Sequence, residues 1–428
     1  FRTFLFEDLL RRTIRLAGWN VFQVMNITDV DDKIIRRADE QGVSIREITE
    51  PVTATFQHDR EFLRIEPAEV YPKATEHIPD MIALIQRLMD KGLAYQADDQ
   101  SIYFAIARFP TYGKLSRLDT RVLRPGARVA ADDYNKEDVR DFALWKAAKP
   151  EDDRTHAAWD SPWGRGRPGW HLECSAMAKR YLGDTLDIHA GGVDLIFPHH
   201  EDEIAQSEGA NDTTFSRFWL HGEFLLTNGE KMAKRVGNVM NVNDLRATGI
   251  GAAAIRHFMF SVRYRQQLNL TEDALDASQR AVRRIGEFAD RLATAKSATP
   301  ALAAAADDLE RDAKSALFDD LNAPQAMAAL FEFIRRANAD LDQGGSDTNA
   351  VDRARTAFAL VNGVLDVVPD QPAIDATFKS WIESQVAARE HARARRDFAT
   401  ADTIRKSLDA RGIAIEDGPL GTRWKKVR

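Results

Sequence analysis

The stretch VFQVMNITDVDDK, residues 21–33, joins an apolar run to a polar loop and the start of a helix. Its first part, residues 21–25, has the character of a short buried strand. Upstream, residues 2–16 have helical periodicity. The order helix, strand, loop, helix predicts an α/β layer with a parallel sheet. Because parallel sheets place their sites at the carboxyl ends of strands, we expect Thr28 to lie at such a site.

Length and composition indicate a globular protein of two to four domains. The chain has 428 residues, of which 44% are hydrophobic and 29% charged. No apolar run reaches 18 residues, so we expect no membrane segment and a cytoplasmic protein. The single cysteine, Cys174, excludes an intrachain disulfide and suits a reducing compartment.

The α/β pattern is interrupted and followed by helices. Residues 73–167 are rich in turns and short strand candidates, which predicts an inserted subdomain. Residues 272–368 have apolar residues at helical spacing and predict a bundle. A terminal module of two helices and a hairpin begins after Pro372.

The segment PHHEDE, residues 198–203, carries the clearest chemistry. His199 and Glu203 are four residues apart, so both side chains project from one helical face. Imidazole and carboxylate suit zinc, and a thiolate at Cys174 would be a third ligand. The alternatives are an exposed ion pair between His199 and Glu203, and a cysteine that is simply a small buried apolar residue.

Two glycine-containing segments are further candidates. In GEKMAKR, residues 229–235, Lys231 and Lys234 could bracket a polyphosphate, or the segment could be a solvated turn. In DIHAGGVD, residues 187–194, the glycines would let the backbone approach a ligand. The alternative for the second segment is an ordinary turn after a strand with a hydrogen-bonded histidine.

The net charge is −7, but the C-terminal end is basic. Residues 389–428 contain 11 Lys/Arg and 6 Asp/Glu, a net of +5, which suggests a nucleic acid partner. We place Arg389, Arg393 and Arg396 on one helical face and expect Trp424 to stack on an unpaired base. A solvated basic helix with a core tryptophan is the alternative.

Taken together, the motifs resemble cysteinyl-tRNA synthetase, a class I aminoacyl-tRNA synthetase, over essentially the whole chain. The matching strings are NITDVDDK (26–33), PGWHLECSAM (168–177), DIHAGGVDLIFPHHEDEIAQSE (187–208), GEKMAKRVGN (229–238), ARRDFATADTIRKSLDARGI (394–413) and DGPLGTRWKK (417–426). The resemblance implies that ATP activates L-cysteine to cysteinyl-adenylate and that the aminoacyl group then moves to tRNA(Cys).

The resemblance also implies the domain order. We expect a Rossmann-like parallel-sheet catalytic domain with an inserted α/β subdomain, then a helical bundle and a small α+β C-terminal domain. The expected bounds are 1–72 with 168–209 for the catalytic domain, 73–167 for the insertion, 210–271 for the lysine-bearing region that contacts the tRNA stem, 272–368 for the bundle and 372–428 for the anticodon-binding domain.

In the family, two Cys, a His and a Glu hold zinc, and Cys174, His199 and Glu203 match three of these. The metal binds the substrate thiolate, which separates cysteine from serine without an editing site. The first zinc Cys and the HIGH-type ATP motif are expected just before Phe1. We therefore expect this chain alone to charge tRNA poorly.

Other positions match the family's remaining motifs. Its amino-acid pocket corresponds to Thr28, Trp170, His189 and Asp194. Its KMSKS signature, which is catalytic, corresponds to Lys231 and Lys234, with Lys234 as the contact to the phosphates of ATP and its magnesium. The motif here is KMAKR, but both lysines remain, so stabilisation of the phosphates is retained. We expect a monomer.

Two other functions fit parts of the sequence. A ligase that joins activated cysteine to an amino sugar in mycothiol synthesis shares the zinc site, but it lacks the anticodon-binding end that residues 394–426 resemble. A catalytically inactive tRNA-binding paralogue would not need the metal ligands and the lysine pair that this chain retains.

Overall fold

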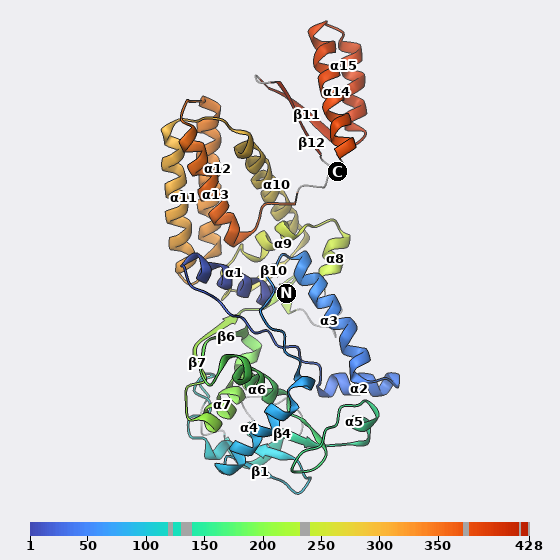
Figure 1. The fold of residues 1–428 in the computed structure, drawn as a ribbon, viewed down its shortest axis with the longest axis vertical. Helices are drawn as coiled ribbons and strands as arrows, with labels where there is room; N and C mark the ends of the chain where they lie inside the picture. The colour runs from blue at the N-terminus through green and yellow to red at the C-terminus, as the bar shows by residue number, and fades with distance from the viewer. Residues whose placement is uncertain (119–122, 130–138, 232–239, 371–375, 419–420, 427–428) are drawn as a thin grey trace. The chain divides into compact units, whose positions relative to one another are not determined.

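The computed structural model describes residues 1–118, 123–129, 139–231, 240–370, 376–418 and 421–426 (Figure 1). The chain divides into two compact units, Phe1–Pro369 and Asp370–Arg428. Among the described residues, none of the helices combines the length and apolar character that a membrane-spanning segment requires.

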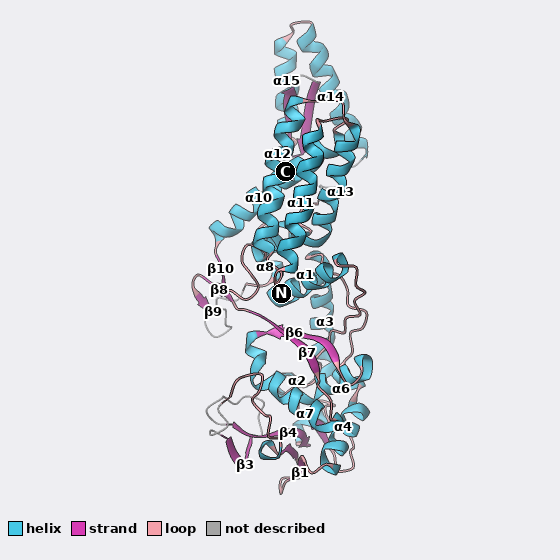
Figure 2. Ribbon diagram, turned by 90° about the vertical axis from the view of Figure 1, so that its left-hand side faces the viewer, coloured by secondary structure: helices cyan, strands magenta, loops and turns pink. Residues whose placement is uncertain are grey.

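A parallel strand pair lies at the centre of the α/β layer. Strands β6 (Leu186–Gly192) and β7 (Ser216–Gly222) pair in parallel over their whole length. Helix α1 (Arg2–Leu16) buries Leu5 and Leu9 and contacts both strands. Figure 2 shows the two strands below α1 and above the helices α6 and α7. This arrangement confirms the predicted Rossmann-like α/β class.

The strand predicted over residues 21–25 does not form as a continuous element. Only two parallel bridges form here, Val24 with Val70 and Ile27 with Lys73. Phe22, in the middle of the run, is exposed, so this segment lacks the continuous buried face that holds a strand in register. The helix predicted after this loop does form, beginning at Asp32.

The other helices of the α/β part flank the strands and the insertion. Among the described residues their bounds are α2 (Asp32–Gln41), α3 (Ile45–Phe62), α4 (Ile78–Asp90), α6 (Trp170–Leu182), α7 (Glu201–Asn211), η1 (Ala74–Glu76), η2 (Ile106–Arg108), η4 (Val193–Leu195) and η5 (Ile196–His200).

The predicted insertion contains its own sheet. The strand order is β1-β2-β4-β3, with β5 paired to β4, and all described pairs except β3–β4 are antiparallel. Phe104 and Phe142 stack in its core with ring centroids 5.1 Å apart. The elements are β1 (Ala94–Gln96), β2 (Ile102–Phe104), β3 (Leu123–Val129), β4 (Val139–Ala147), α5 (Pro150–Arg154) and β5 (Gly166–Pro168).

A small sheet and two helices connect β7 to the bundle. β8 pairs in parallel with β10 and antiparallel with β9. The bundle buries apolar faces at the expected helical spacing, with Ile285 and Leu330 completely buried. The bounds are β8 (Leu225–Thr227), β9 (Glu230–Lys231), α8 (Val242–Ala247), α9 (Ala252–Met259), β10 (Leu268–Leu270), α10 (Glu272–Thr294), α11 (Pro300–Phe318), α12 (Ala323–Gln343) and α13 (Thr348–Leu365).

The second unit is a helical hairpin packed on a β-hairpin. Ile382, Leu408 and Ile413 form its buried core. β11 and β12 pair antiparallel, with Ile415 opposite Trp424. Its elements are α14 (Ala376–Ala394), α15 (Phe398–Asp409), β11 (Ile413–Gly418) and β12 (Gly421–Lys426).

Candidate active site and metal centre

The three side chains predicted to bind a metal lie together. Cys174 comes from α6, His199 from the turn η5 and Glu203 from the first turn of α7. Their sulfur, nitrogen and oxygen donor atoms all lie within 4.8 Å of one another. His199 and Glu203 are buried, and His199 Nε2 is 3.9 Å from Glu203 Oε2. The alternative of an exposed ion pair is therefore wrong.

The charge balance of this cluster favours a bound cation. Glu203 is fully buried; among the described residues its Oε1 accepts no hydrogen bond, and its Oε2 faces His189 Nε2 at 3.1 Å. Burial and then the carboxylates of Glu203 and Glu173 raise the pKa of the Cys174 thiol. A buried thiolate beside a carboxylate is unfavourable unless a cation neutralises both. Since zinc accepts thiolate, imidazole and carboxylate ligands, the residues present fit this metal.

Buried groups behind His199 fix the orientation of its ring. His199 Nδ1 is 2.9 Å from His171 Nδ1, so its Nε2 is left facing Glu203. His171 Nε2 lies 3.4 Å from Asp202 Oδ2, and the Tyr112 hydroxyl donates to Asp202 Oδ1 at 2.5 Å. Burial lowers the pKa of both His171 and His199 to about 3. Neutral imidazoles held through their second nitrogen are the usual form of histidine metal ligands.

Two more histidines lie around Glu203: His189, which was predicted for the amino-acid pocket, and His200, which was not among the predicted site residues. His189 Nε2 is 3.1 Å from Glu203 Oε2, and His200 Nε2 is 3.9 Å from the same atom. Donor atoms of His189, His200 and Glu203 also lie within 4.8 Å of one another. His200 Nδ1 in turn is 2.8 Å from His221 Nε2. His221 lies at the carboxyl end of β7, where the sites of parallel sheets are expected. Its contact with His200 depends on how β6 and β7 pair, which the sequence does not show.

The predicted amino-acid pocket is partly assembled around the cluster. The ring centroids of Trp170 and His199 are 4.4 Å apart, so Trp170 covers the imidazole of His199. His189 contacts Glu203, as described above. Among the described contacts, neither Thr28 nor Asp194 forms a hydrogen bond or ion pair with the cluster; Asp194 is exposed in η4. Their role in the pocket stays a prediction.

One glycine of the DIHAGGVD segment is required by a close approach. A Cβ atom at Gly191 would lie 2.9 Å from His200 Cε1 and 3.0 Å from Leu195 Cδ1. Real Cβ atoms essentially never approach another atom to within 3.0 Å, so a side chain here would displace His200. We predicted that a ligand would approach these glycines closely. At Gly191 the close neighbour is instead the protein's own His200.

Of the two lysines predicted to contact ATP, the structure describes the backbone of one. Lys231 lies in β9, where its backbone pairs with Leu226. Lys234 lies outside the described residues. Their joint contact with ATP phosphates therefore stays a prediction.

The predicted arginine face of the C-terminal unit needs correction. Arg389 is buried, and its two Nη atoms donate to the Asp417 carboxylate at 2.7 and 2.8 Å. Arg393 pairs with the same carboxylate. Helix α14 ends at Ala394, and Arg396 has a φ of 60°, so it does not share a helical face with the other two. Arg389 therefore binds the hairpin rather than presenting its guanidinium to solvent.

Two aromatic residues of this unit differ in exposure. Trp424 is half-buried and packs against the core, so only part of its ring is accessible. Phe398, at the start of α15, is 62% exposed and follows Arg395 and Arg396. Sequence analysis missed Phe398, since a phenylalanine at a helix start is ordinarily a core residue.

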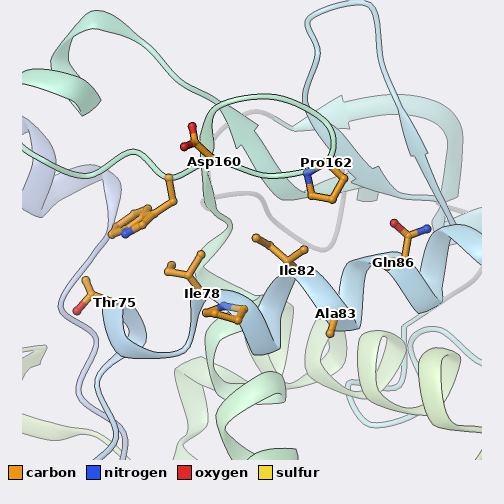
Figure 3. A pocket seen from close by; sticks show the side chains of 9 residues that line it. Thr75, Ile78, Ile82, Ala83, Gln86, Asp160 and Pro162 are labelled. Carbon is orange, nitrogen blue, oxygen red and sulfur yellow. The ribbon is translucent and has the colours of Figure 1, made fainter.

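A surface groove lies apart from the predicted metal ligands (Figure 3). It measures about 640 Å³ and runs between α4 and the loop that follows α5. Thr75 at its edge donates to the buried Asp29, next to Thr28, through its backbone and hydroxyl at 2.9 and 2.6 Å. None of the predicted site residues lines this groove, whose walls are Thr75, Ile78, Pro79, Ile82, Ala83, Gln86, Trp159, Asp160 and Pro162.

Comparison with known proteins defines the class. The family model described as "tRNA synthetases class I (C) catalytic domain" matches residues 1–280. The model described as "DALR domain" matches residues 314–368. "Cysteinyl-tRNA ligase anticodon binding domain" matches residues 378–424. The fold resembles methionyl-tRNA synthetase of Mycobacterium tuberculosis in complex with methionyl-adenylate, with a TM-score of 0.60, 16% identity and 86% of each chain covered. The parallel sheet, the bundle and these domains are those of a class I aminoacyl-tRNA synthetase.

Full-length relatives narrow the class to one family. A cysteine–tRNA ligase of Solibacter usitatus is 46% identical over 432 residues, covering 100% of this chain and 91% of the relative. One of Chlamydia caviae is 42% identical over 434 residues, covering 100% and 90%. The chain belongs to the cysteine–tRNA ligase family, which confirms the predicted enzyme class. The match over residues 378–424 excludes the amino-sugar ligase, which lacks that end.

Proposed function

We propose that this chain activates L-cysteine with ATP and transfers it to tRNA(Cys), selecting cysteine by a zinc ion held by Cys174, His199 and Glu203. The observation that carries the proposal is the convergence of these three donor atoms within 4.8 Å, in a chain of this family. Bound zinc would supply a soft Lewis acid that favours the thiolate of cysteine over the hydroxyl of serine.

The residues around the ligands prepare the site for this role. His171 holds the His199 ring by its Nδ1 atom. Trp170 covers the same ring and excludes water from one side of it. His189 contacts one oxygen of Glu203 and thereby limits the rotation of the carboxylate. These contacts keep three ligands in place before substrate arrives, which lowers the cost of organising the site.

The chemical step joins the cysteine carboxylate to ATP. The carboxylate oxygen attacks the α-phosphorus, the bond to the β-phosphate oxygen breaks, and pyrophosphate leaves. We assign Lys231 and Lys234, with magnesium on the phosphates, to neutralise the charge that develops there. In the second step a ribose hydroxyl of the tRNA end attacks the carbonyl carbon and AMP leaves.

The C-terminal unit is assigned to the tRNA anticodon. Arg389 and Arg393 both pair with Asp417, but only Arg389 is buried. The accessible groups are therefore the exposed Arg393 and Arg396, the exposed ring of Phe398 and the open side of Trp424. Arginine for phosphates and aromatic rings for unpaired bases is the usual chemistry of single-stranded RNA recognition. We further propose a cytoplasmic monomer.

Cysteine-dependent exchange of pyrophosphate into ATP tests the proposal. We expect exchange with cysteine and almost none with serine. Treatment with a chelator should abolish the exchange, and zinc should restore it. Equal exchange with serine, or full activity of a metal-free protein, would contradict zinc-based selection.

A further inference from the structure

The segment PHHEDE ends in three acidic residues that are all completely buried. Glu201, Asp202 and Glu203 each have an exposed fraction of 0%. We assign Glu203 to the metal, whereas the proposed reaction uses neither Glu201 nor Asp202. A buried carboxylate is costly unless hydrogen bonds or a cation compensate its charge. The partners of Glu201 and Asp202 therefore indicate what these two residues hold in place.

Glu201 binds a loop of the inserted subdomain. Residues 112–116, with the sequence YGKLS, form a turn after η2 that we call the YGKLS loop. The Glu201 carboxylate accepts three hydrogen bonds from this loop. Their donors are the backbone N–H groups of Gly113, Leu115 and Ser116, at 2.8, 3.1 and 2.8 Å. Because N–H groups that surround one anion make strong, charge-assisted bonds, they fix the loop to the first turn of α7.

Two further features hold the YGKLS loop in this conformation. Gly113 has a φ of 93°, and a Cβ atom there would lie 2.7 Å from Leu118 Cβ, so the turn requires glycine. Lys114 pairs with Glu208, two turns further along α7. The loop is thus attached to α7 at both Glu201 and Glu208.

Asp202 connects the same loop to the predicted metal ligand His199. The Tyr112 hydroxyl donates to Asp202 Oδ1 at 2.5 Å, and Asp202 Oδ2 lies 3.4 Å from His171 Nε2. His171 Nδ1 is in turn 2.9 Å from His199 Nδ1. If His199 binds a metal through Nε2, its proton lies on Nδ1 and is donated to His171, whose own proton then faces Asp202. Each histidine then has one tautomer, and the Asp202 carboxylate favours this arrangement.

We infer that the YGKLS loop is a positioning element of the metal centre, acting through Tyr112 and Glu201. Tyr112 fixes the carboxylate behind the two histidines and so sets the plane of the His199 ring. Glu201 holds the turn of α7 from which Glu203 projects. The inference rests on the proposed function, which supplies the zinc ion and the cysteine thiolate. It gives the inserted subdomain a role in the recognition of cysteine.

Tyr112→Phe tests the inference because it removes only the hydroxyl that contacts Asp202. Tyr103→Phe is the matched control: both tyrosines are 2% exposed, and the Tyr103 hydroxyl donates to Asp99 at 2.9 Å in the same subdomain. Zinc affinity is measured by competition with a chromophoric chelator, and the geometry of the site by the visible spectrum of the cobalt(II)-loaded protein. Pyrophosphate exchange gives KM and kcat for cysteine, and urea denaturation gives the stability.

We expect Tyr112→Phe to lower zinc affinity by a factor of about ten or more, the usual cost of losing a group that orients a metal ligand. Its cobalt spectrum should shift from that of the wild type, and the KM for cysteine should rise more than kcat falls. Tyr103→Phe should lose similar stability and change neither the metal affinity nor the spectrum. A zinc affinity and cobalt spectrum of Tyr112→Phe equal to those of the control would overturn the inference.

Glu201→Gln tests the second contact of the loop. The amide keeps one acceptor oxygen but places an NH₂ group against backbone N–H donors, so the loop should lose part of its attachment to α7. We expect zinc affinity to fall here as well, and an unchanged affinity would contradict the role of Glu201. Wild-type protein that binds no zinc, or that exchanges no pyrophosphate with cysteine, would instead contradict the proposed function.

Discussion

His189 Nε2 lies 3.1 Å from Glu203 Oε2, closer than the ring nitrogens of His199 and His200, which lie 3.9 Å from this buried carboxylate oxygen that we assign to zinc. The contact links strand β6 to the first turn of α7. It leaves the other oxygen of Glu203 available to a metal.

Replacing His189 should therefore weaken metal binding. We expect His189→Gln to lower zinc affinity about tenfold or more, the usual cost of losing a group that orients a metal ligand. Competition with a chromophoric chelator measures this directly. His391→Gln, in an exposed position on α14, is the matched control and should change nothing. An unchanged zinc affinity in His189→Gln would show that Glu203 is held by other contacts.

A second prediction concerns the packing of α1 on β7. A Cβ atom at Gly222 would lie 2.9 Å from Phe6 Cδ1, and Phe6 stacks on Tyr264 with centroids 4.9 Å apart. We expect Gly222→Ala to destabilise the protein by about 1–3 kcal/mol through overpacking. Adding Phe6→Leu should recover part of that loss, and a double-mutant cycle of urea denaturation measures the coupling. Additive effects would contradict the contact.

The ion pairs of Asp417 should make the C-terminal unit sensitive to acid. The hydrogen bonds from Arg389 come first among the causes that hold the pKa of Asp417 well below its usual range. A depressed carboxyl pKa stabilises the fold above the unfolded value of about 4 and loses that contribution as the pH falls towards the folded pKa. Asp417→Asn should remove this pH dependence and leave the buried Arg389 unpaired.

Hydrogen exchange of α14 in the intact chain, followed from pH 6 down to pH 3, measures the effect. Wild-type protection should decrease in this range, whereas the protection of Asp417→Asn should be lower at pH 6 and change less. Parallel curves for the two proteins would argue against a structural role for the pair.

Phe398 should contribute to tRNA binding through its exposed ring. We expect Phe398→Ala to weaken tRNA(Cys) binding by about 1–3 kcal/mol, the range for loss of one base stack. Pyrophosphate exchange should be unaffected because it does not need tRNA. Phe318→Ala is the control, since Phe318 is 53% exposed but lies on the bundle. If both variants bind tRNA equally well, Phe398 makes no stacking contact.

Local patterns predicted much of the fold and part of the site. The spacing of His199 and Glu203 defines one helical face whatever the tertiary structure, and the bundle follows from apolar periodicity. The pairing of His200 with His221 could not be predicted, because it depends on the register of β6 against β7. The engagement of Arg389 likewise depends on where the β-hairpin places Asp417.

The strand predicted over residues 21–25 shows that an apolar composition alone does not predict burial or strand pairing. The run is apolar, but Phe22 is exposed and the chain forms only isolated bridges there. Burial is decided by neighbours that are distant in sequence, and short apolar runs carry little information about them.

Zinc content tests the central claim most directly. Elemental analysis of wild-type protein and Cys174→Ser, purified side by side, compares a thiolate ligand with a hydroxyl of similar size. The claim predicts about one zinc per wild-type chain and far less in the variant, because an alcohol is a poor zinc ligand. A wild-type protein without zinc, or a variant that retains all of it, would contradict the assignment of Cys174, His199 and Glu203.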